Sequence, residues 1–186
     1  MNRREALQSI SLLLGGTILG AEAFLSGCKA STDKDVSFSE KDIAFLNEVA
    51  DTILPATKTP GAKAAKVGEL ITVMVNDCYE EKDQQMFHDG MGQLNDRAKK
   101  DYDDDFIDLK LEQRHALLVK LDQEQKAYSK TKKETDPPHY FRLMKELTLL
   151  GYFTSEIGCK QARRYVETPG KWDACIPYAK GDKAWC

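Results

Sequence analysis

The stretch Ser39-Glu-Lys-Asp-Ile-Ala-Phe-Leu-Asn-Glu-Val-Ala-Asp-Thr-Ile-Leu54 decides the fold class, because it reads as an amphipathic helix with a start and a stop. Ser39 offers an N-cap, and Asp42, three residues later, gives a spacing close to that of a capping box. The helix should end near Leu54, because Pro55 disfavours a helical conformation in the residue before it. Apolar residues recur at helical spacing, at Ile43, Leu46, Val49, Ala50 and Ile53.

The same periodicity continues through most of the chain. It predicts helices over residues 64–79, 82–100 and 111–129, and a fifth from Pro137 to about Ser155, since proline suits a helix start. The expected inward-facing positions are Val67, Leu70, Ile71, Met74, Met86, Phe87, Met91, Leu94, Leu111, Leu117, Leu118 and Leu121. No alternating strand pattern competes with these helices. We therefore predict an all-α protein.

The C-terminal stretch from Gly158 to Cys186 differs in character, because it is rich in glycine and proline and carries both tryptophans. A short helix near residues 161–166 followed by ordered coil is expected there. The predicted organisation is a signal peptide over residues 1–27, a tether over 28–37, and one compact domain over 38–186. That domain should contain about five helices and a loop-rich, aromatic tail.

The first residues read as an export signal. Arg3 and Arg4 precede a mostly apolar run that is too short for a membrane-spanning helix. The run leads to Leu25-Ser-Gly-Cys28, a lipoprotein cleavage box in which the Cys28 thiol would receive the lipid. The arginine pair indicates a twin-arginine signal, which carries proteins that are already folded. Together with the cleavage box it predicts an exported, periplasmic lipoprotein that is anchored to the membrane. An ordinary Sec lipoprotein signal is the alternative, because the residues flanking the arginine pair depart from the usual ones.

Charge and cysteine content narrow the class of protein further. The formal net charge is −3 and the basic residues are mixed with acidic ones, so no nucleic-acid partner is expected. Four cysteines besides Cys28 could form two disulfides with three possible connectivities: Cys78, Cys159, Cys175 and Cys186. Cys159 and Cys175 flank a short segment and form the first pair to test. A free cysteine, or one bonded to a partner chain, is the alternative.

The patterns that could carry chemistry are weak. Asp101, Asp103, Asp105 and Glu112 fill positions of a calcium loop, but Phe106 stands where the sharp turn needs glycine. We prefer to read them as an acidic linker whose negative charge favours the start of the next helix. Gly90-Met-Gly92 lies within a helical pattern and indicates close helix packing. The three histidines lack ligands at metal spacing. No catalytic, cofactor-binding or metal-binding residue is predicted in this chain.

Aromatic residues near the C-terminus indicate a protein-binding surface instead. Tyrosine and tryptophan favour interfaces, because they bury a large area while their polar ends stay satisfied. The residues expected at a partner interface are Tyr152, Phe153, Glu156, Tyr165 and Trp172. The alternative is that they simply close the core of a small helical domain, and both roles could hold together.

Several segments together resemble the gluconate 2-dehydrogenase subunit 3 family, the small subunit of membrane-bound flavin dehydrogenases. They are the twin-arginine leader, Ile53-Leu54-Pro55, Thr59-Pro-Gly-Ala62, Gly151-Tyr-Phe-Thr-Ser-Glu-Ile-Gly158, Tyr165, Pro169-Gly170 and Cys175. The resemblance implies a non-catalytic subunit that binds, matures and escorts a large FAD-dependent oxidoreductase of the glucose-methanol-choline (GMC) type through the twin-arginine pore. That partner would oxidise a sugar, sugar acid or glycoside and pass electrons to a cytochrome c subunit or another membrane acceptor.

Two other functions compete with this one. A stand-alone envelope lipoprotein with a structural or binding role would explain the leader without a partner enzyme. An independent enzyme would need a site assembled from residues such as His139, Glu156 and Asp173, which nothing in the sequence groups together.

Overall fold

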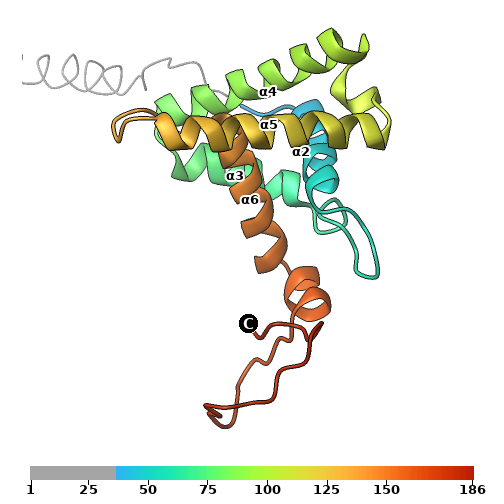
Figure 1. Ribbon diagram of the computed structural model, residues 1–186, viewed down its shortest axis with the longest axis vertical. Coiled ribbons are helices and arrows are strands. Elements are labelled where there is room, and N and C mark those ends of the chain that lie inside the picture. Colours follow the sequence, from blue (N-terminus) through green and yellow to red (C-terminus); the bar gives the residue numbers. More distant parts are fainter. Residues whose placement is uncertain (1–36) are drawn as a thin grey trace, which may run out of the picture. The chain divides into compact units, whose positions relative to one another are not determined.

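The computed structural model describes residues 37–186, and this part of the chain is helical. Its elements are α2 (Glu40–Ile53), α3 (Val67–Cys78), α4 (Glu81–Tyr102), α5 (Leu111–Thr131) and α6 (Tyr140–Thr154), with a short 3-10 turn η1 (Phe106–Asp108) and a π-helical turn η2 (Gly158–Ala162) (Figure 1). Within residues 37–186 there is no strand, only an isolated bridge between Arg164 and Trp185. The predicted all-α class is confirmed. Arg3, Arg4 and Cys28 lie outside the described residues.

The start of α2 follows the predicted capping chemistry. The Ser39 hydroxyl accepts a hydrogen bond from the Asp42 amide at 3.3 Å, and the Asp42 carboxylate accepts one from the Ser39 amide at 2.8 Å. These reciprocal bonds satisfy two backbone donors that the first turn of a helix leaves without partners. The helix ends at Ile53, one residue before the expected position, and Leu46, Val49 and Ala50 on its inner face are buried.

Helix α6 is the centre of the packing, because it contacts each of the other four α-helices. Phe141, Met144 and Leu147 on α6 belong to one buried core with Phe87 and Leu94 of α4 and with buried residues of the other helices. In Figure 1, α6 runs across α5 and continues toward the C-terminal tail. The exposed side chains of α6 are therefore held by a helix that packs against the four other α-helices.

Two helices begin later than the periodicity predicts. Residues 62–66 form a turn, in which Lys66 has a left-handed backbone (φ 54°), so α3 starts at Val67 rather than near residue 64. Likewise, α6 starts at Tyr140 and not at Pro137. His139 takes the N-cap position, and its Nδ1 accepts a hydrogen bond from the Phe141 amide at 3.2 Å.

Further expectations about the interior and the tail were wrong. Leu70 and Leu111, both expected to face inward, are 36% and 60% exposed. Leu111 is the first residue of α5 and precedes the part of that helix that packs inward. The helix expected over residues 161–166 is replaced by η2, which starts at Gly158. The Gly158 amide donates to the Ser155 hydroxyl at 3.0 Å, and a Cβ on Gly158 would collide with the Tyr152 carbonyl oxygen. The chain can therefore turn this tightly after α6 only with glycine there.

Candidate partner-binding surface

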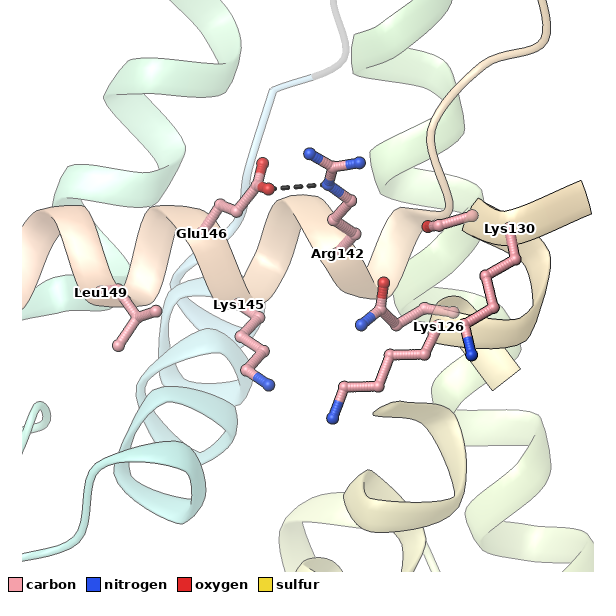
Figure 2. Close-up of a pocket in the computed structure, with 8 residues that line it drawn as sticks. Lys126, Lys130, Arg142, Lys145, Glu146 and Leu149 are labelled. Carbon is pink, nitrogen blue, oxygen red and sulfur yellow. Dashed lines mark hydrogen bonds and ion pairs between the residues drawn. The ribbon is translucent and has the colours of Figure 1, made fainter. Parts of the chain in front are cut away.

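An open groove of about 430 Å³ lies between α5 and α6 (Figure 2). Four basic side chains line it, and they come from both helices: Lys126, Lys130, Arg142 and Lys145. Gln125, Ser129, Glu146 and Leu149 complete the wall. The groove is open and charged side chains stand along it, whereas small-molecule sites are usually concave and enclose most of the ligand. This shape suits contact with another macromolecule better than catalysis.

Carboxylates hold most of these cations in place. Asp122 on α5 pairs with Lys126 and, across the helix boundary, with Lys145, each at 2.6 Å. Arg142 pairs with Glu146 at 2.7 Å, as the dashed line in Figure 2 shows. The ammonium groups hydrogen-bonded to Asp122, first Lys126 and then Lys145, lower the pKa of this carboxyl to about 2. The groove therefore has an ordered, charged rim at neutral pH.

A second groove, of about 460 Å³, continues the first along α6. The two share Glu146 and Leu149, and the second adds Leu150, Phe153, Thr154 and Arg163. Leu150 is 46% exposed, and the Arg163 guanidinium lies over the Phe153 ring at 4.5 Å from its centroid. We call the residues lining both grooves the α6 surface. Arginine and large apolar groups rimmed by charge are the composition of protein interfaces.

The two aromatic residues predicted near the end of α6 have different places. Phe153 is half-buried and belongs to the α6 surface. Tyr152 is buried in the core, and its hydroxyl donates to the Pro60 carbonyl at 2.8 Å. Its ring meets Phe153 edge to face at 5.2 Å between centroids. Tyr152 thus packs against Phe153 from the core side, and its own ring is not exposed to a partner.

The other predicted interface residues are exposed. Glu156 forms an ion pair with Lys160 at 2.8 Å, and that hydrogen-bonded lysine lowers the pKa of Glu156. Tyr165 is 48% exposed and Trp172 is 87% exposed. Every residue from 165 to 186 is exposed, including the large apolar side chains Val166, Ile176, Tyr178 and Trp185. Such a concentration of exposed aromatic and apolar groups is typical of binding surfaces.

The tail is held as a closed loop, which we call the tail loop (residues 165–184). The Arg164 amide donates to the Ala184 carbonyl at 2.8 Å, and the Cys186 amide donates to the Arg164 carbonyl at 3.2 Å. The Arg164 guanidinium lies 5.4 Å from the centroid of the Trp185 ring and pairs with Asp182 at 3.4 Å. The ends of the loop are thereby joined while its aromatic side chains face solvent.

The four cysteines are thiols in this structure: Cys78, Cys159, Cys175 and Cys186. Cys186 lies beside Cys159, because its thiol contacts the Cys159 carbonyl at 3.8 Å. Cys175, the partner expected from sequence spacing, is exposed within the tail loop.

The acidic run spans the end of α4 and the segment before η1, while Glu112 lies in the first turn of α5. Asp101 pairs with Lys120 at 3.0 Å, and Asp105 with Lys99 at 3.1 Å and with the Asn95 amide at 2.5 Å. The carboxylates thus engage separate partners. Among residues 37–186, no group of three histidine, cysteine or acidic side chains is arranged to hold a metal ion.

The residues considered for an independent enzyme do not meet. His139 caps the start of α6 and Glu156 follows its end, so this helix of 15 residues separates them by about 20 Å. Asp173 lies in the tail loop. Burial lowers the pKa of His139, whose ring stacks on Tyr140 at 4.6 Å. These positions give His139 a role in capping and packing.

The α6 surface itself was missed by sequence reasoning, although one signal was present. Leu149 and Leu150 are adjacent on a helix, so only one of them can point fully toward the core. The pairs Lys126–Lys130 and Arg142–Lys145 also place cations on common helix faces.

Comparison with protein families gives a match to the model described as Gluconate 2-dehydrogenase subunit 3, over residues 40–170. The match covers all five α-helices and the first part of the tail. The chain belongs to this family. No curated protein and no solved structure matches it. In the part that the structure describes, none of the helices combines the length and apolar character needed to cross a bilayer.

Proposed function

We propose that this chain is an accessory subunit that docks onto, matures and escorts a large FAD-dependent oxidoreductase of the GMC type. The observation that carries the proposal is the tail loop, in which Trp172 and Tyr178 are 87% and 78% exposed. Two such rings in water do not stabilise a monomer, whereas their burial against a partner would stabilise a complex. Membership of a dehydrogenase-subunit family supplies the class of the partner.

The partner would approach two adjoining regions. The α6 surface offers Phe153 and Leu150 as apolar contacts and Arg142, Lys145 and Arg163 as cations, so the facing surface should carry carboxylates. The tail loop then adds aromatic anchors. In this proposal FAD is bound by the partner, which oxidises a sugar, sugar acid or glycoside. Electrons pass from there to a cytochrome c subunit or another membrane acceptor.

In this proposal the leader determines how the complex is exported and how it is attached to the membrane. Arg3 and Arg4 would direct a folded pair through the twin-arginine pore, and lipid on Cys28 would hold the pair at the periplasmic face of a membrane. A partner without its own signal could then be exported on this chain's signal.

Co-purification tests the docking step. A tagged chain solubilised from membranes should retain a flavoprotein, detected by flavin absorbance and by peptide mass. The double variant Phe153→Ala, Trp172→Ala should lose most of it, with at least a tenfold fall in captured flavin, because interface aromatics carry much of the binding energy. Leu111→Ala is the matched control, since Leu111 is also exposed and apolar but lies at the far end of α5. A wild-type chain that purifies as a monomer without flavoprotein would instead indicate a stand-alone envelope lipoprotein.

A second experiment tests the escort step. Replacing Arg3 and Arg4 with lysine preserves the charge but removes the arginine pair that the twin-arginine route reads. We expect the flavoprotein to accumulate in the cytoplasm, which cell fractionation with an activity stain would detect. Continued export of both chains would contradict a twin-arginine route and point to Sec export or to a separate signal on the partner.

A further inference from the structure

The end of the chain returns to the turn that follows α6. Cys159 lies in η2, where its thiol donates to the Phe153 carbonyl at 3.3 Å. Cys186, the last residue, contacts the Cys159 carbonyl through its own thiol at 3.8 Å. Burial and then the contact with the Cys186 thiol raise the pKa of Cys159. The two thiols are therefore neighbours, although 27 positions separate the residues in sequence.

This proximity is held by contacts that do not involve sulfur. Both backbone hydrogen bonds between Arg164 and the segment 184–186 fix the last three residues beside η2. Lys183 donates through its ammonium group to the Gln161 carbonyl, which adds a second attachment to η2. Two cysteines can be bridged without backbone movement only where the fold already places them close together. Here the hydrogen bonds between Arg164 and the segment 184–186 hold Cys186 close to Cys159.

The other two cysteines are placed differently. Cys78 ends α3, and Cys175 is exposed in the middle of the tail loop, where its amide bonds to Asp173. Among residues 37–186, the contact between cysteines that the structure records is that of Cys159 with Cys186. The short sequence spacing of Cys159 and Cys175 is therefore a poorer guide than the closed geometry of the tail.

We infer that Cys159 and Cys186 form an intramolecular disulfide that converts the tail loop into a covalent ring. The oxidant is a disulfide-containing protein or small molecule. The exposed Cys186 thiolate attacks it, forming a mixed disulfide and releasing one thiol of the oxidant. The Cys159 thiolate then attacks the Cys186 sulfur, and the second thiol leaves. The two cysteines lose two protons and two electrons, and the oxidant becomes two thiols.

The ring would fix the part of the chain that presents the exposed aromatic residues. A loop of this length that is closed only by hydrogen bonds can open, whereas a covalent link limits the conformations available to it. Pre-ordering a binding loop lowers the entropy that must be given up on docking. The disulfide itself concerns this chain alone, so its presence does not depend on the proposed partner.

Peptide mapping of the purified full chain tests the inference. The chain is incubated with oxidised glutathione, remaining thiols are alkylated, and the protein is digested without reduction. We expect a peptide that joins Cys159 to Cys186, lighter by two hydrogen atoms than its separate halves. Cys78→Ser and Cys175→Ser should still give this peptide, and Cys186→Ser should not. A Cys159–Cys175 peptide, a link to another chain, or alkylation of both Cys159 and Cys186 after oxidation would overturn the inference.

Limited proteolysis provides an independent measurement on the same protein. A protease that cuts within the tail loop of oxidised chain should leave two fragments that migrate together without reductant and separate when reductant is added. The Cys175→Ser variant should behave identically. Fragments that separate without reductant would contradict a ring closed by Cys159 and Cys186.

Discussion

Gly90 lies where α4 closely approaches the start of α6. A Cβ at this position would lie 2.5 Å from the Cβ and Cγ of Tyr140, so α4 can approach the start of α6 only because Gly90 has no side chain. Gly92, two residues later, has no atom within 4 Å of the corresponding position. The two glycines of Gly90-Met-Gly92 therefore differ in role, although they look equivalent in sequence.

Alanine substitutions at these two positions should have opposite effects. Gly90→Ala should lower the free energy of unfolding by about 1–3 kcal/mol, because Tyr140 or α4 must shift to relieve the overlap. Gly92→Ala should raise it by up to about 1 kcal/mol, since alanine favours helix more than glycine does. Urea unfolding followed by far-ultraviolet circular dichroism measures both. Equal destabilisation by the two variants would contradict this assignment.

Single residues also show where sequence reasoning stops. The Ser39–Asp42 cap was predictable because its bonds join residues three positions apart. For Tyr152 the sequence left core and interface as alternatives, because the bond that fixes its place joins its hydroxyl to a carbonyl 92 positions away. Leu111 and Leu117 are both leucines at positions that the helical periodicity places inward, yet only Leu117 is buried. Tertiary packing makes that difference.

At the scale of elements, Asp122 is the charged link between α5 and α6. It accepts from Lys126 on its own helix and from Lys145 on α6, and these bonds lower its pKa from 3.8 to about 2. Because the folded pKa is below the unfolded value, the stabilisation is complete above about pH 4 and is lost as the pH falls toward 2.

Asp122→Asn should remove that pH dependence. We expect the variant to lose on the order of 1 kcal/mol of unfolding free energy at pH 7, since the site is partly screened by solvent. Between pH 4 and pH 2 the wild type should approach the stability of the variant. Thermal unfolding across this pH range checks the prediction, with Asp104→Asn, an exposed carboxylate just after α4, as the control. A constant difference between wild type and variant at all pH values would contradict it.

The starts and ends of elements followed local chemistry unless a neighbouring residue offered a better cap. Pro137 and Pro138 suit a first helical turn, but His139 accepts the Phe141 amide and so fixes the start of α6 at Tyr140. The π-helical turn of η2 depends on the approach of Gly158 to the Tyr152 carbonyl, which periodicity does not encode.

At the scale of the whole described chain, the packed core and the proposed docking region are different parts. The core lies in α2 to α6 and the segments between them, and no residue from 165 to 186 is buried. Sequence composition identified the tail as a separate, aromatic region. It could not show the adjoining α6 surface, because that surface is formed only when α5 and α6 pack together.

Removing residues 165–186 should therefore separate the two properties. The free energy of unfolding should change by less than about 0.5 kcal/mol, because exposed residues contribute little to it. Capture of the flavoprotein should fall at least tenfold. Circular dichroism melting and co-purification measure the two effects on the same preparation. A large loss of stability would mean that the tail is part of the fold and would contradict this division.

The location of both tryptophans gives the molecule a built-in optical probe. Trp172 and Trp185 are the two indoles of the chain, and both stand in or beside the tail loop, 87% and 53% exposed. Emission of the free chain should thus be that of indole in water, and melting of the helices should barely change it. A shift to shorter wavelength on mixing with a flavoprotein would report tail contact directly, and energy transfer to the flavin could place the tail relative to that cofactor.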